Sequence, residues 1–269
     1  MALNIFLHEF KTKLPSTIGW SAAIAGLILV FSAMFSAIAG QVESLNNFLA
    51  NYPKELLIAF GLNGVDLSTV LGFFSFVFLF IQICLAIQAA NYGFSLVSVE
   101  ESEWTADFLL TKPVKRTRIM TSKVAAAVVC LTITNAAVWA ASFLFLNLFR
   151  GSHPLDSATL SLLLASIFVF QLFFLGVGLG ISMLVRRIRS VIPYSLALAF
   201  GMYVLSAFGS QLGTSILEKI TPFKHFEPVY ALQHGTYDWA LVMVSVIVIL
   251  VSVTAGYILY SRRDIPGVS

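Results

Sequence analysis

Hydrophobic residues fill six long stretches of this chain that contain no lysine, arginine, aspartate or glutamate. The charged residues that bound these stretches are Lys13 and Glu43, Asp66 and Glu100, Lys123 and Arg150, Asp156 and Arg186, Arg189 and Glu218, and Asp238 and Arg262. Each stretch exceeds the roughly 20 residues with which a helix crosses the hydrocarbon core of a bilayer. Transmembrane helices are therefore expected near residues 18–40, 70–97, 124–148, 159–185, 190–210 and 239–261.

Charged residues make up only 11% of the chain, whereas soluble domains carry roughly 25%. The pattern therefore predicts an all-α integral membrane protein, with one transmembrane domain over residues 1–269 and the lipid bilayer as its surroundings. Ahead of the first span, Leu3, Phe6, Leu7 and Phe10 share one helical face, and Pro15 follows. Residues 2–14 are expected to form an interfacial helix in the plane of the membrane. The alternative is a polar lead-in to the first span.

The basic residues are unevenly divided between the two sides of the membrane. All of the 16 lysines and arginines except Lys54, Arg150, Lys219 and Lys224 fall in the N-terminal lead, in the second-to-third and fourth-to-fifth connections, and in the C-terminal tail. Such an excess marks the cytoplasmic side. Because six spans return the chain to its starting side, both termini are expected in the cytoplasm, in a plasma or inner membrane.

The longest charged segment joins the second and third expected spans. Its first half is acidic and its second half is basic, an order that suits the dipole of a helix. Trp104 and Phe108 are four residues apart and so share one helical face, and Pro113 ends the helix. Residues 98–118 are therefore expected to hold a short amphipathic helix at the membrane surface, within reach of a soluble partner.

Motifs for catalysis or metal binding are absent from the sequence. There is no G-x-x-x-x-G-K-[ST] loop, so the chain is not expected to hydrolyse ATP or to act as an enzyme. The four histidines lie outside the expected spans, and a solvated or interfacial role is expected for them, His225 and His234 included, in preference to a metal site. Cys84 and Cys130 fall inside apolar spans and are interpreted as buried thiols.

Several uncharged polar residues lie within the expected spans, among them Gln82, Gln88, Asn91, Asn135 and Gln171. Hydrogen bonding between helices is the interpretation favoured for most of them. Gln82, Asn135 and Gln171 are also candidates to line a substrate path. In the same way, Gly176 and Gly180 are expected to allow close helix packing. The lack of ionisable residues in the spans argues against an ion-coupled carrier.

The connection between the second and third spans resembles the cytoplasmic loop of ABC-2 type transporter permeases, the membrane subunits of ATP-binding-cassette exporters. The resemblance is carried by Glu101, Thr105, Leu109-Leu110, Pro113-Val114, Arg116 and Lys123. Trp104 departs from the family pattern, in which a glycine commonly precedes the threonine. Residues 2–14 are similar to the elbow helix of the family, and residues 221–226 are similar to its loop between the last two spans.

The resemblance implies a homodimer of this permease, with two copies of a separate ABC ATPase docked on a coupling helix. The residues it assigns to docking are Glu100, Glu101, Glu103, Trp104, Thr105, Asp107, Phe108, Leu109, Pro113 and Arg116. ATP and Mg would be bound by the ATPase, so no cofactor is expected in this chain and no nucleic acid among its partners. Export, a prokaryotic source and accessory proteins are further expectations, and the cargo stays open. The alternatives are an ion-coupled secondary carrier and a membrane-embedded enzyme without an ATPase.

Overall fold

The computed structural model describes residues 2–38, 64–102, 115–185, 190–212 and 215–262, together with positions 51, 53, 57, 62 and 188. The long helices in these ranges are α1 (Ala2–Ile38), α4 (Val70–Ser102), α6 (Arg116–Phe149), α7 (Ser157–Leu184), α8 (Val191–Leu212) and α12 (Trp239–Arg262). Short helices join α8 to α12, namely α9 (Ser215–Ile220), α10 (Pro222–His225) and α11 (Pro228–His234).

Six helices in the described part of the chain are long and apolar enough to cross a membrane. They lie over the six stretches that the sequence marks, and no strand occurs among the residues that the structure describes. The expected fold class, an all-α integral membrane protein, is therefore confirmed.

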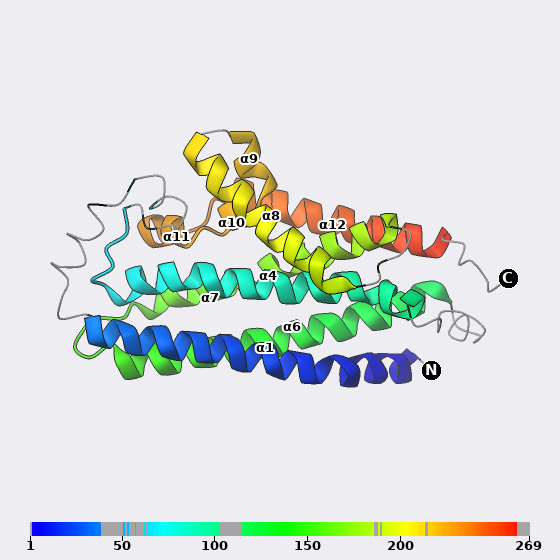
Figure 1. Ribbon diagram of the computed structural model, residues 1–269, viewed down its shortest axis with the longest axis horizontal. Coiled ribbons are helices and arrows are strands. Elements are labelled where there is room, and N and C mark those ends of the chain that lie inside the picture. The colour runs from blue at the N-terminus through cyan, green and yellow to red at the C-terminus, as the bar shows by residue number, and fades with distance from the viewer. Residues whose placement is uncertain are drawn as a thin grey trace.

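The long helices pack in pairs along one common axis (Figure 1). Helix α1 packs along α6 and α4 along α7, while α12 covers α7 and α8 crosses α4. The start of α1, the end of α4, the start of α6 and the end of α12 all lie at the same end of the molecule (Figure 1). The connection that carries the predicted coupling segment therefore leaves and re-enters the bundle beside the first turns of α1.

Helix α1 runs through the predicted boundary between an elbow helix at residues 2–14 and the first span. The structure has one helix from Ala2 to Ile38, with Pro15 inside it. Proline removes one backbone hydrogen bond, a loss that membrane helices tolerate where neighbouring groups compensate. Contacts with α6 hold α1 on both sides of the proline: Glu9 lies 3.5 Å from Lys123 Nζ, and Ser21 donates to Thr134 at 3.4 Å. A separate elbow helix is thus unconfirmed.

Glycines set the distance between α7 and its two neighbours. A Cβ atom on Gly93 of α4 would lie 2.4 Å from the Leu175 carbonyl oxygen of α7, and one on Gly178 would lie 3.0 Å from that of Ala90. Gly176 and Gly180 instead face α12, where an added Cβ would make ordinary contacts of 3.4 Å and 3.7 Å. The predicted packing role of these two glycines is therefore seen against α12, and the tighter crossing is the one between α4 and α7.

Candidate functional site

The predicted docking residues are divided between described and undescribed parts of the chain. Glu103, Trp104, Thr105, Asp107, Phe108, Leu109 and Pro113 lie outside the described residues. Glu100 and Glu101 belong to the last turn of α4, and Arg116 is the half-buried first residue of α6. The coupling helix itself therefore stays a prediction, while the two helix ends that carry it are defined.

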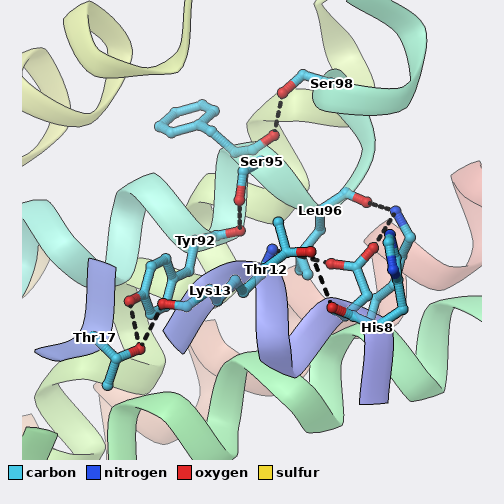
Figure 2. A network of polar contacts seen from close by, with 11 residues as sticks. His8, Thr12, Lys13, Thr17, Tyr92, Ser95, Leu96 and Ser98 are labelled. Carbon is cyan, nitrogen blue, oxygen red and sulfur yellow. Dashed lines mark hydrogen bonds and ion pairs between the residues drawn. The ribbon is translucent and has the colours of Figure 1, made fainter. Parts of the chain in front are cut away.

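A cluster of buried charges lies where these two ends meet α1. This ionic cluster consists of Glu9, Lys13 and Lys123. One carboxylate oxygen of Glu9 accepts from Lys13 Nζ at 3.1 Å, and the other lies 3.5 Å from Lys123 Nζ. Lys123 also donates to the backbone carbonyl oxygen of Leu96 in α4 at 2.6 Å. Figure 2 shows this network with Lys13 and Leu96 on neighbouring helices. The cluster thus joins α1, α4 and α6.

Burial makes the pairing in the ionic cluster energetically important. The side chain of Lys123 is only 2% exposed, and that of Glu9 is 15% exposed. A charge taken out of water is costly unless it is paired and hydrogen-bonded. Removing one partner of a buried pair typically costs about 3–5 kcal/mol because the other charge is left uncompensated. Lys123 is therefore held at this position by its contacts with α1 and α4.

The sequence offered only a partial signal for this cluster. Glu9 and Lys13 stand four residues apart, with the acid first, which is the favourable order for a pair on one helix face. Lys123 was identified as part of the loop resemblance, at the start of the third span. The contact between Glu9 and Lys123 depends on the packing of α1 against α6, which no spacing in the sequence encodes.

A polar seam of uncharged side chains continues from the ionic cluster into the bundle. Thr17 of α1 and Tyr92 of α4 share a hydrogen bond of 2.9 Å (Figure 2). One turn further along α4, the amide of Gln88 donates to the hydroxyl of Thr134 in α6 at 2.8 Å. Ser21 of α1 also reaches Thr134, at 3.4 Å. The seam therefore joins the same three helices again, at a greater depth in the bundle.

The candidate path-lining residues are buried within this bundle. Asn135 donates to Gln171 at 2.7 Å, and Gln171 donates to Gln88 at 3.3 Å, so both belong to the polar seam. Gln82 lies apart from them and donates to the carbonyl oxygen of Phe226 at 2.9 Å. All three side chains make hydrogen bonds between elements, which is the role favoured for most polar residues of the spans. A place along a substrate path stays a prediction.

His225 corrects the expectation of a solvated or interfacial histidine. It is 1% exposed, with Nδ1 2.6 Å from the hydroxyl of Ser245 and Nε2 3.2 Å from the carbonyl oxygen of Lys219. Because a carbonyl oxygen only accepts, Nε2 carries the proton and Ser245 donates to Nδ1. Burial lowers the pKa of His225 below its ordinary value. The ring is buried because α10, which carries it, packs against α8, α9 and α12.

Aromatic rings surround the segment that carries His225. Phe223 packs edge-on against Phe170 of α7 with centroids 5.1 Å apart, and it also contacts Tyr203 of α8 at 5.8 Å. Phe226 contacts Tyr237 at 5.8 Å. Such edge-to-face pairs stabilise packing beyond their buried area. The segment between α8 and α12 is therefore part of the core of the molecule.

The chemistry available to the described residues is limited. No group of three or more His, Cys, Asp or Glu side chains that could hold a metal ion occurs among them. Both cysteines are free thiols; Cys130 is buried as predicted, whereas Cys84 is half-buried. The described residues instead form hydrogen bonds and ion pairs that hold the membrane helices together.

A bundle of membrane-crossing helices of this kind belongs to the class of multi-pass membrane proteins. The model of the family described as ABC-2 family transporter protein matches residues 3–265, a range that contains the described long helices except for the first residue of α1. The chain therefore belongs to the ABC-2 transporter family, as the loop resemblance implied, and is a membrane permease of that type. No curated protein matches the chain.

Proposed function

We propose that this chain is the permease subunit of an ABC-2 exporter and that a separate ABC ATPase supplies its energy. The family match over residues 3–265 carries the proposal. The sequence contains no phosphate-binding loop of the G-x-x-x-x-G-K-[ST] type, so ATP and Mg would be bound by the partner. Two copies of the permease would form the pathway, with two ATPase subunits on the cytoplasmic face.

The ATPase would dock on the segment between α4 and α6. Both helix ends are positioned at one end of the bundle (Figure 1), and the intervening residues carry acids, two aromatic side chains and then bases. Trp104 and Phe108 would be the buried anchors, since aromatic residues dominate binding energy at interfaces. The surrounding charges would set the orientation of the partner. The full docking set is the one that the loop resemblance assigned.

Membrane orientation follows from the same proposal. The start of α1 and the end of α12 lie at the same end of the bundle as the end of α4 and the start of α6 (Figure 1), so both termini would be cytoplasmic and the opposite end would face outward. The excess of basic residues at this end supports that orientation. A prokaryotic plasma or inner membrane is the proposed location.

Two substitutions test the docking anchors. Trp104→Ala and Phe108→Ala are each expected to weaken ATPase binding by about 2 kcal/mol or more, the usual effect at an interface hot spot. The affinity of the labelled ATPase for the permease in nanodiscs measures this, and Trp239→Ala, at an exposed tryptophan of α12, is the matched control. Native affinity in both docking variants would contradict the anchor assignment. Failure of the wild-type chain to bind any ATPase would contradict the proposed function.

One observation favours an ion-coupled carrier, because the ionic cluster places buried ionisable groups inside long apolar helices. The position of the ionic cluster argues against a carrier. Lys123 lies about 10 Å from the start of α6 at the rise of an α-helix, whereas coupled-ion sites lie near the bilayer midplane. Cargo uptake into vesicles that hold an ion gradient but no nucleotide would establish the carrier instead.

A further inference from the structure

Lys123 is the meeting point of the three helices that lie beside the docking segment. Its ammonium group contacts Glu9 of α1 and the Leu96 carbonyl of α4, although Lys123 itself belongs to α6. Leu96 lies less than two turns before the end of α4, and Lys123 lies about two turns after the start of α6. The two arms that carry the docking segment are therefore tied to each other and to α1 immediately inside the bundle.

One turn deeper, a second polar contact joins α1 to α4. Thr17 is four residues after Lys13 on α1, and Tyr92 is four residues before Leu96 on α4. Their hydroxyls are 2.9 Å apart, and Tyr92 is 2% exposed. These two levels of buried polar contacts oppose sliding of α1 past α4, and the bond from Gln88 to Thr134 adds α6, because a slide would leave buried polar groups unpaired.

We propose that the pair of Glu9 and Lys123 makes α1, α4 and α6 move as one body when the docking segment is displaced. The two residues are positioning residues: they do not contact the ATPase, and they pass its movement from α4 and α6 to α1. The inference rests on the proposed function, since the displacement comes from the docked ATPase. It assigns the coupling between ATPase movement and helix movement to Glu9 and Lys123, which lie outside the docking segment.

The test uses the full complex of permease and ATPase in nanodiscs, with Glu9→Gln and Lys123→Gln. Both variants keep side-chain size and a polar end but remove the ion pair. Both variants are expected to bind the ATPase with native affinity. The permease changes the rate at which the ATPase hydrolyses ATP, and this change is expected to be at least about fivefold smaller in the variants than in wild type. Lys11→Gln, at an exposed lysine on the same helix, is the matched control and is expected to behave as wild type.

A distance measurement separates coupling from a merely structural role. Spin labels are introduced by Leu7→Cys on α1 and Thr117→Cys on α6, both exposed positions, with Cys84→Ala and Cys130→Ala in the background. The distance between the labels is expected to be the same without nucleotide and with ATP when the cluster is intact. In Glu9→Gln it is expected to change or broaden with ATP, because α6 then moves without α1.

Charge exchange provides the second arm. Glu9→Lys and Lys123→Glu each place like charges together, and the double variant restores an opposite pair between α1 and α6. Its hydrolysis response is expected to exceed that of either single variant but to stay below wild type, since a carboxylate at position 123 cannot donate to the Leu96 carbonyl.

Three results would overturn the proposal. One is an unchanged hydrolysis response and label distance in both glutamine variants. Another is a loss of ATPase affinity that accounts for the whole effect, because the cluster would then only shape the docking surface. The third is a double variant no better than the single variants. If the wild-type chain binds no ATPase, the proposed function fails and this inference fails with it, and the wild-type binding assay identifies that case.

Discussion

At the scale of single residues, several buried polar groups of this permease are paired by contacts that join distant parts of the chain. Glu9 and Lys123 are the clearest case, and His225 with Ser245 is a second. The sequence identifies the residue types but not the partners, because each contact depends on how two helices pack. His225 was expected to be solvated or interfacial because it lies between spans, yet the connection that carries it folds into the core.

The lowered pKa of His225 leads to a dependence of stability on pH. Above about pH 6.5, the ordinary histidine pKa, the ring is neutral in both the folded and the unfolded chain. Below that pH the unfolded chain takes up a proton that buried His225 resists, so the free energy of unfolding falls as the pH drops toward the folded pKa. Thermal unfolding at pH 7.5 and at pH 5.5 is expected to show a lower Tm in acid.

The contribution of His225 is isolated by substitution. His225→Gln keeps a donor and an acceptor but does not titrate, so the acid-induced decrease in Tm is expected to be smaller in this variant than in wild type. His234→Gln, at an exposed histidine of the same connection, is the control and should keep the full decrease. An equal pH dependence in wild type and His225→Gln would show that other groups cause it.

At the scale of helices, glycines, which have no side chain, set the packing distance between α4 and α7. Gly93 and Gly178 bring the backbones of α4 and α7 into contact, and these helices also share the polar seam through Gln88 and Gln171. Small residues allow such close approach in membranes, where no hydrophobic force drives helices together. Among the contacts between described helices, the crossing of α4 and α7 is therefore the one in which an added Cβ would come closest to a backbone atom.

Gly93→Ala tests this packing contact. The new Cβ would lie 2.4 Å from the Leu175 carbonyl oxygen, so α4 and α7 must separate. Overpacking of this kind costs about 1–3 kcal/mol, and a lower Tm in detergent is expected. Gly201→Ala in α8, where nothing lies within 4 Å, is the control and should gain up to about 1 kcal/mol of helix propensity. A Gly93→Ala protein as stable as wild type would refute the close crossing.

Helix positions were the most predictable part of this fold, because the thickness of the bilayer fixes how long an uncharged stretch must be. The ends of the helices were less predictable. The interfacial helix was predicted at residues 2–14, just before Pro15, and proline disrupts a helix where nothing else supports the backbone. In α1, Glu9 and Ser21 contact α6 on either side of the proline, and the helix continues.

At the scale of the whole molecule, the helices are longer than the membrane they cross. Helix α6 has 34 residues, which corresponds to about 51 Å, against a hydrocarbon core of about 30 Å. Its ends therefore project beyond the core, and the ionic cluster near its start lies close to the membrane surface. The apolar stretches themselves contain no charged residue. The charges of the ionic cluster lie just beyond these stretches, where neighbouring helices, and not lipid, bury them.

Accessibility of the two ends of α6 tests the orientation of the entire molecule. Thr117 lies at its start, beside the docking segment, and Ser152 lies just after its end, and both are exposed. In a background with Cys84→Ala and Cys130→Ala, a membrane-impermeant maleimide added to intact cells is expected to label Ser152→Cys and to leave Thr117→Cys unlabelled until the cells are broken. The reverse pattern would place the docking segment outside, where no ATP-driven partner could reach it. Because α6 is one uninterrupted helix, its two ends must lie on opposite sides of a membrane that it crosses, so the two variants serve as controls for each other.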